Sequence, residues 1–172
     1  DYKSKRPGYA SEGTAQDISS HGVSMQIQQI GDEFWVEATV PFQKMGPNLE
    51  QAAENLYRHF FTTIAGLGNP IRIWQIIPQI NNESGEPSER YRQYNSGRLR
   101  GWTGARPYPA ASAVGSYARV NEIHFAALVS PHPTVTLENP RQIPAFDYSK
   151  KYGNLPPVFS RALWHRAPER TE

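Results

Sequence analysis

The sequence predicts an α+β fold in which one mixed β-sheet is covered on one face by two helices. Two observations support this prediction: strand-type segments open and close the folded part of the chain, and two segments of helical periodicity separate the strands in between. The predicted order is strand, strand, helix, strand, helix, strand, strand. Because consecutive strands occur at both ends of this order, a mixed sheet is favoured over a doubly wound parallel one.

The first predicted elements form a β-hairpin. Residues 21–30 and 34–40 both alternate between apolar and polar side chains, and Gly31 and Asp32 lie between them. A glycine-containing turn between two alternating segments is a typical hairpin signal. We therefore expect two antiparallel strands early in the sheet.

A helix is predicted over residues 49–65. Asn48 and Gln51 are spaced as in a capping box, and Gly66 and Gly68 end the helical pattern. The apolar residues of this segment recur at helical spacing and form one stripe, which consists of Leu49, Ala52, Ala53, Leu56, Tyr57, Phe60 and Ile64.

The segment 71–77 is predicted to be a buried strand. It is almost entirely apolar, with Arg72 and Gln75 as the exceptions, and Pro70 and Pro78 bound it on either side.

A second helix is predicted to begin near Pro87, since proline suits a first helical turn, where no N–H is needed. One face of this helix carries phenols and a guanidinium where a core helix would carry aliphatic residues: Tyr91, Tyr94, Asn95, Arg98 and Trp102. Such a face can bind a small polar anion. Alternatively, the rings pack at a helix edge while their polar tips reach solvent. Residue types alone leave both alternatives open.

The remaining predicted strands are 110–117 and 122–130, and 134–137 is a candidate short edge strand. From residue 131 the chain becomes rich in proline, which prevents long regular elements and favours an extended strap or linker. The predicted organisation is a polar N-terminal arm over residues 1–20, an α+β domain over 21–130, and a Pro-rich connector over 131–172.

Composition excludes several classes of function. The chain has 172 residues, a net charge of +2 and no long basic run, which argues against a nucleic-acid partner. No stretch approaches the roughly 20 apolar residues of a membrane span. Cysteine is absent and the five histidines are scattered, so we expect no metal site, and the composition suits a cytoplasmic protein. Phosphate-loop, nucleophile-elbow and zinc-protease motifs are absent from the sequence.

Five spaced motifs lie along the chain: IWQIIPQIN at 73–81, ERYRQYNSGR at 89–98, PYPAASAVG at 107–115, LENPRQ at 137–142 and YGNLPPVFSRALW at 152–164. In this order they resemble the motifs of the chorismatase family, whose domains resemble the Rid superfamily of reactive-intermediate deaminases. The resemblance implies a Rid-like (chorismate-mutase-like) sheet. It also implies that the chain is the first domain of a longer enzyme, followed by a connector toward a second domain that this chain does not contain.

The resemblance further implies an activity. Chorismatases hydrolyse the enolpyruvyl ether of chorismate, without metal or organic cofactor, to pyruvate and a hydroxybenzoate or dihydroxycyclohexadiene carboxylate used in secondary metabolism. By resemblance, Arg161 is the candidate for binding a substrate carboxylate, with Tyr91 and Tyr152 as phenolic donors. The alternatives are an ion pair that ties the connector down for Arg161, and packing against the sheet for Tyr91. The catalytic residues are unknown, and the catalytic acid is expected in the second domain.

Two further expectations concern function. Where Rid deaminases carry an arginine in P-A-R-S, this chain carries Ala111, which disfavours imine deamination. The competing hypothesis is a non-catalytic Rid-like domain for scaffolding, oligomerisation or docking. Under either hypothesis the sheet face without helices needs a cover, so we expect self-association or a second Rid-like domain.

Overall fold

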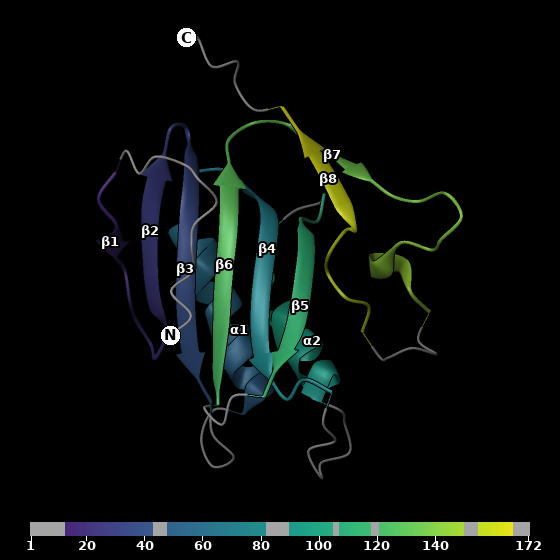
Figure 1. The fold of residues 1–172 in the computed structure, drawn as a ribbon, viewed down its shortest axis with the longest axis horizontal. Coiled ribbons are helices and arrows are strands. Elements are labelled where there is room, and N and C mark those ends of the chain that lie inside the picture. Colours follow the sequence, from purple (N-terminus) through teal and green to yellow (C-terminus); the bar gives the residue numbers. More distant parts are fainter. Residues whose placement is uncertain are drawn as a thin grey trace.

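The computed structural model describes residues 13–42, 48–81, 90–104, 107–117, 121–149 and 155–166 of the chain. The elements in chain order are β1 (Gln16–Asp17), β2 (Ser24–Ile30), β3 (Glu33–Pro41), α1 (Leu49–Thr63), β4 (Asn69–Pro78), α2 (Arg90–Gly101), β5 (Ala110–Ser116), β6 (Glu122–Ser130), β7 (Thr134–Leu137), the short 3-10 helix η1 (Ala145–Asp147) and β8 (Ala162–His165). Figure 1 shows their arrangement, with the strands in front and both helices behind them.

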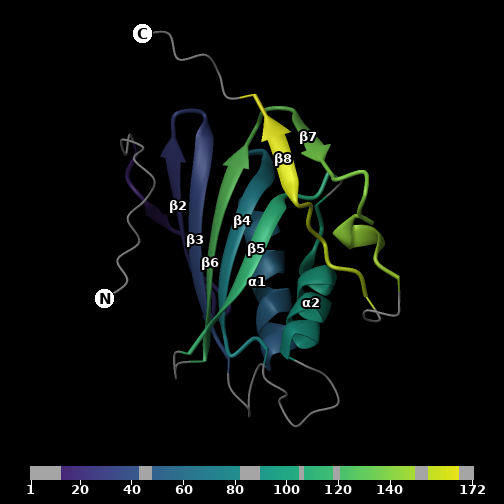
Figure 2. The same ribbon diagram turned by 45° about the vertical axis from the view of Figure 1, so that its right-hand side comes forward.

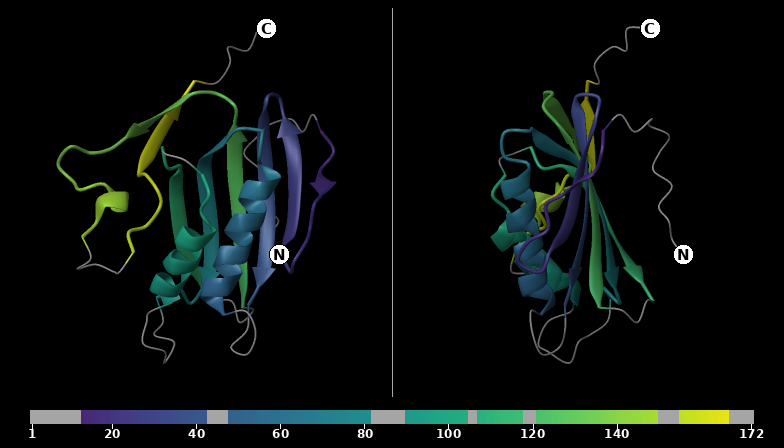
Figure 3. Two further views of the ribbon diagram at one scale, coloured as in Figure 1. Left: turned by 180° about the vertical axis from the view of Figure 1, so that it is seen from behind. Right: turned by 90° about the vertical axis from the view of Figure 1, so that its left-hand side faces the viewer.

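Six strands form one mixed sheet in the order β1-β2-β3-β6-β4-β5. β4 and β5 are parallel, and the other neighbouring pairs are antiparallel. The chain makes the β4–β5 connection through α2, as a parallel pair requires. Seen edge-on, α1 and α2 lie on the same side of this sheet (Figure 3). The predicted α+β class, the mixed sheet and its one-sided helical cover are therefore confirmed.

The predicted hairpin and the first helix are confirmed with small shifts in their bounds. The Asn48 side chain accepts a hydrogen bond from the Gln51 N–H at 2.8 Å, so Asn48 caps α1. The Gln51 side chain instead donates to Asn55 at 2.9 Å, so the reciprocal half of a capping box is not made. Pro87, where the second helix was expected to begin, lies outside the described residues, and the described part of α2 begins at Arg90.

The hydrophobic core lies between the helices and the sheet. The apolar stripe of α1 packs onto inward-facing residues of the central strands, among them Val36, Ile73, Phe125 and Val129. The alternation along β3 and β6 follows from this, because only every second residue faces the helices.

The two helices are in very close contact, and two glycines of α2 allow it. A Cβ atom added to Gly97 would lie 1.9 Å from the carbonyl oxygen of Glu50, and one added to Gly101 would lie 2.5 Å from that of Glu54. Both distances are far inside van der Waals contact. The absence of side chains at these two positions therefore sets how closely α2 approaches α1.

The segment 134–137 is a strand, but the expectation that it could form an edge of the main sheet is wrong. It pairs antiparallel with β8 in a separate two-stranded sheet, which we call the ribbon. Figure 2 shows the ribbon beyond the start of β5, where Ser160 pairs with Ala110. The sequence does not predict β1, which is only two residues long, or β8, which lies in the Pro-rich segment expected to be an extended strap.

Candidate functional site

Three polar side chains meet between the sheet and the helices, in the middle of the core. Gln75 on β4, Tyr57 on α1 and Tyr94 on α2 are all buried. The hydroxyl groups of Tyr57 and Tyr94 both donate to Oε1 of Gln75, and the Tyr57 bond is 3.0 Å long. The amide nitrogen of Gln75 donates to the carbonyl oxygen of Ser112 at 3.2 Å. The buried amide is thus paired at its oxygen and its nitrogen, as a core polar group must be.

The environment of the two phenols keeps them protonated. Burial raises the pKa of Tyr57 above its ordinary value, although the nearby positive charge of Arg98 acts in the opposite direction. Burial raises the pKa of Tyr94 further, with a smaller contribution from neighbouring Tyr57. Both hydroxyls therefore serve as donors at neutral pH.

Arg98 lies next to this cluster and is only 2% exposed. Its guanidinium lies over three aromatic rings, 5.4, 5.7 and 5.8 Å from the ring centroids of Tyr57, Trp102 and Phe159. One terminal nitrogen donates to the carbonyl oxygen of Val158 at 2.6 Å, while Nε has no hydrogen-bond partner among the described residues. Arg98 therefore connects α2 to the connector.

The face of α2 that could have bound an anion is mostly packed. Tyr94 and Arg98 are buried in the domain, and Trp102 packs edge-to-face against Phe61, with the ring centroids 4.7 Å apart. Tyr91 is the more accessible member, at 36% exposure. For this face as a whole, the geometry favours packing over capture of an anion from solvent.

Arg161, the predicted carboxylate ligand, lies in the connector just before β8 and is engaged by the connector itself. It forms an ion pair with Glu138 at 3.0 Å, and it donates to the carbonyl oxygen of Ile143 at 3.2 Å and to the hydroxyl of Tyr148 at 2.9 Å. The Arg161 backbone N–H also donates to Glu138, at 3.1 Å. The ion pair named as the alternative for Arg161 is therefore present.

The three predicted substrate-binding residues are not gathered into one site by the described part of the structure. No interaction joins Arg161 to Tyr91 within the described ranges, and Tyr152 lies outside them. Substrate binding by Arg161, Tyr91 and Tyr152 stays a prediction.

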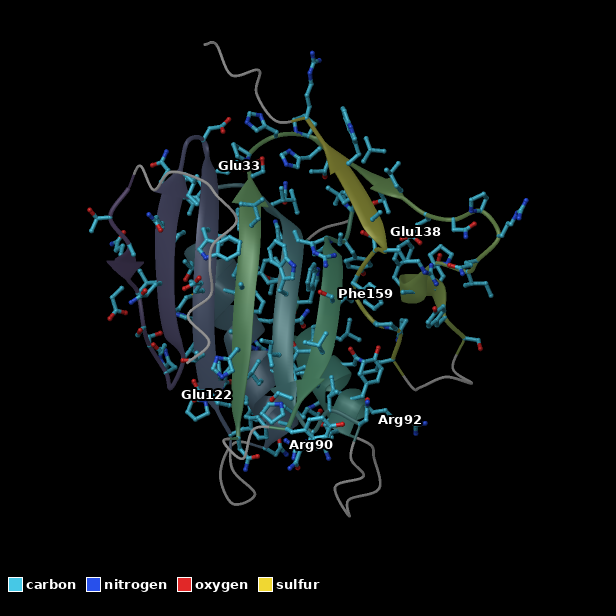
Figure 4. All side chains as sticks on the ribbon, in the orientation of Figure 1. Glu33, Arg90, Arg92, Glu122, Glu138 and Phe159 are labelled. Carbon is cyan, nitrogen blue, oxygen red and sulfur yellow. The ribbon has the colours of Figure 1, made fainter. Side chains whose placement is uncertain are left out.

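Three of the five histidines connect separate segments of the chain. His59 on α1 is 2.8 Å from the carbonyl oxygen of Ile18, His132 pairs with Asp32, and Nε2 of His165 is 3.3 Å from Glu33. Figure 4 shows Glu33 at one end of the sheet and Glu122 at the other. Among the described residues, no three histidine, aspartate or glutamate side chains are grouped so that they could hold a metal ion.

The sheet face opposite the helices carries large side chains. The rings of Trp35 on β3 and Trp74 on β4 are 5.5 Å apart, and the guanidinium of Arg72 lies 5.2 Å from the centre of the Trp74 ring. Arg72 also donates to Ser112 at 3.0 Å, and burial lowers its pKa. We call Trp35, Arg72, Trp74 and Ser112 the open-face cluster.

Sequence reasoning missed the partners of these residues more than the residues themselves. Arg72 and Gln75 had been noted as polar exceptions in an apolar strand, and this exception is the signal that both have a specific environment. Glu138 lies in the LENPRQ motif but had no assigned role, because its partner Arg161 is 23 residues away.

None of the described helices is long and apolar enough to cross a membrane.

The fold and its buried cluster first define a class, an α+β domain with a six-stranded mixed sheet, two helices on one face and a connector held by arginines. The profile described as "Chorismatase FkbO/Hyg5-like, N-terminal" matches residues 13–128. The chain therefore belongs to this chorismatase family, whose N-terminal domain it matches, as the five motifs had indicated.

Individual relatives agree with this assignment. The chain is 35% identical over 103 residues to a 3-hydroxybenzoate synthase from Streptomyces hygroscopicus, covering 58% of this chain and 30% of that protein. It is 34% identical over 119 residues to a chorismatase from Streptomyces rapamycinicus, covering 66% of this chain and 35% of that protein. A crystal structure of a chorismatase superposes with a TM-score of 0.70 at 27% identity, over 90% of this chain and 46% of that one.

The match thus covers only part of the length of each relative. The chain spans about a third of the curated relatives and 46% of the solved chorismatase. These shares leave more than half of each of those proteins outside the comparison.

Proposed function

We propose that this chain is the N-terminal part of an enzyme that hydrolyses the enolpyruvyl ether of chorismate, releasing pyruvate and a hydroxybenzoate or a dihydroxycyclohexadiene carboxylate. The observation that carries the proposal is the family match over residues 13–128. The similarity to a solved chorismatase over 90% of the chain supports it. Chorismate as the substrate and the cytoplasm as the location are parts of this proposal.

The proposed reaction needs a proton donor and water, and no cofactor. A proton is delivered to the terminal carbon of the enolpyruvyl group, water adds to the ether-bearing carbon, and the hemiketal then collapses to pyruvate and the dihydroxycyclohexadiene carboxylate. A hydroxybenzoate product requires in addition that the ring loses one water, so that its formation consumes no net water. General acid catalysis typically contributes ~10²–10⁴-fold to such a rate. The group that delivers the proton is therefore the central catalytic residue.

Three of the described carboxylates of this chain form ion pairs with arginines. Glu138 is paired with Arg161, Glu50 with Arg100 at 2.6 Å and Glu54 with Arg58 at 2.8 Å. By resemblance to the family, we assign the catalytic acid to the part of the enzyme that follows this domain. This domain then contributes framework and, by resemblance, the substrate-binding groups Arg161, Tyr91 and Tyr152.

The proposal is tested by comparing this chain with a polypeptide extended to the relatives' length. Pyruvate release from chorismate is followed with a coupled reductase assay, and the ring product is separated by chromatography. We expect turnover by the extended protein and negligible turnover by residues 1–172. An extended, folded protein that leaves chorismate intact would overturn the proposal, and rapid turnover by residues 1–172 would overturn the assignment of the acid.

The alternative function is a non-catalytic domain for oligomerisation or docking, and the open-face cluster is the observation that favours it. Two tryptophans and a partly desolvated arginine on a sheet face that neither described helix covers are typical of a surface that binds a partner. Self-association or a second Rid-like domain across this face stays part of the proposal. Light scattering at about 19.4 kDa for residues 1–172, with no binding of an apolar dye, would contradict it.

A further inference from the structure

The ribbon formed by β7 and β8 has its apolar face toward solvent. Val135 pairs with Trp164 and Leu137 pairs with Ala162, so these four side chains share one face. All four are exposed: Val135 at 53%, Leu137 at 52% and Trp164 at 52%, and Ala162 is exposed as well. We call these four residues the ribbon patch.

The opposite face of the ribbon is the one turned toward the domain, although it is the more polar of the two. Thr134, Thr136, Leu163 and His165 lie on it and are half-buried. His165 reaches Glu33 at the β2–β3 turn, at 3.3 Å. If burial of apolar surface alone set the orientation of the ribbon, the face with valine, leucine and tryptophan would be buried and the face with threonine would be exposed. The ribbon's orientation therefore needs another cause.

Polar contacts around the ribbon hold it in this orientation. The Arg161–Glu138 pair joins the beginning of β8 to the end of β7. One residue earlier, the Ser160 N–H donates to the carbonyl oxygen of Pro109 at 2.9 Å, and its hydroxyl donates to that of Tyr108 at 2.8 Å. These contacts tie the ribbon to the start of β5. These polar contacts hold the ribbon patch toward solvent in one orientation, as in a preorganised binding surface.

The size of the patch restricts what can cover it. Three half-exposed side chains amount to on the order of 300 Å² of apolar surface. A stable interface between separate proteins needs roughly 1,000 Å² or more. A partner already tethered beside the patch needs far less, because the linkage provides an effective concentration in the millimolar range.

We propose that the ribbon patch is the docking surface for the second half of the same polypeptide. This inference rests on the proposed function, in which the chain is the first part of an enzyme of the relatives' length. In such a protein the polypeptide that continues past β8 emerges next to Trp164, and the relatives have more than half of their length outside the match. The docking element presents an apolar surface that packs across Trp164, Val135 and Leu137.

Hydroxyl-radical footprinting tests the proposal on residues 1–172 and on the polypeptide of the relatives' length. Trp164 is expected to be oxidised readily in the shorter chain and about fivefold or more slowly in the longer one, as for a half-exposed ring that becomes buried. Tyr117 follows β5 at the far end of the sheet from the ribbon and is fully exposed, so it serves as the internal control. Equal oxidation of Trp164 in both proteins would overturn the proposal. So would protection in residues 1–172 that grows with protein concentration, since the occupant would then be a second copy.

A pair of variants gives an independent measurement. Trp164→Ser is expected to lower the melting temperature of the longer protein while leaving residues 1–172 unchanged, and Tyr117→Ser is expected to change neither. An equal effect of Trp164→Ser in both lengths would show that the tryptophan acts within this domain only, against the proposal. Chorismate turnover is measured on the same preparations. Protection without turnover would then refute the proposed function alone, and turnover without protection would refute the docking surface alone.

Discussion

Replacement of Gly97 by alanine should separate α1 from α2 and destabilise the domain. The added Cβ would lie 1.9 Å from the carbonyl oxygen of Glu50 and 2.9 Å from Cβ of Ala53, whereas ordinary contacts begin near 3.4 Å. The obstacle is helix backbone, which cannot turn aside as a flexible side chain can. The helices must therefore move apart by roughly 1 Å or more.

The magnitude follows from two opposing effects. Overpacking a tight contact costs typically about 1–3 kcal/mol, and alanine is favoured over glycine within a helix by up to ~1 kcal/mol. Because the clash involves backbone, we expect the upper part of the first range and a net loss of about 1–2 kcal/mol. For a chain of this size that corresponds to a melting temperature lower by roughly 2–8 °C.

Urea denaturation followed by tryptophan fluorescence and circular dichroism measures the effect. The matched control is Ser96→Ala on the same helix, which adds no atom and should change stability by less than about 0.5 kcal/mol. Stability of Gly97→Ala equal to or above that of the parent chain would refute the close helix contact, since only the helix preference of alanine would then remain.

Three further predictions concern the buried cluster and the connector. Tyr57 and Tyr94 have pKa values raised above 10.0 in the folded chain, so their contribution to stability is complete below pH 10 and is lost as pH rises from there toward the folded values. Tyr94→Phe should make this loss shallower by up to about 1.4 kcal/mol per pH unit in urea denaturation above pH 10, and parallel curves would contradict the reasoning. Arg98→Met should speed hydrogen exchange of the Ser160 amide by about tenfold or more relative to amides of β6, because the hydrogen bond from Arg98 to the carbonyl oxygen of Val158 is lost. An unchanged exchange rate of the Ser160 amide relative to those of β6 would count against this role of Arg98. In the extended enzyme, Arg161→Ala should lower kcat/KM for chorismate by about 10- to 100-fold through lost charge-assisted hydrogen bonds, and unchanged kinetics would rule out its substrate-binding role.

The elements that could be predicted are those whose signal is local. The stripe of α1 and the apolar run of β4 are complete within 15 and 10 residues, so periodicity alone identifies them. β8 has four residues in a proline-rich segment, and its partner β7 ends 25 residues before β8 begins. Nothing in either segment by itself indicates that pairing.

The candidate site shows the same difference between what a local segment indicates and what depends on distant partners. Gln75 is visible in the sequence as a polar residue in an apolar strand, but its role depends on Tyr57 and Tyr94 reaching it from two different helices. Arg161 was selected by family resemblance, whereas its ion pair with Glu138 depends on how the connector folds back. Residue types therefore indicate where polar chemistry occurs, and the fold determines which groups it joins.

The position of β6 has a consequence for how this chain folds. β6 is the last strand of the main sheet in sequence, yet it lies between β3 and β4 and joins the two halves of the sheet. Until residues 122–130 have left the ribosome, β2–β3 and β4 have no hydrogen-bonded connection, and each exposes an unpaired edge. Such long-range pairing slows folding relative to proteins with local contacts. The growing chain therefore carries two open strand edges from the completion of β4 until β6 is made, and the nascent domain depends on the arrival of one nine-residue segment to close them.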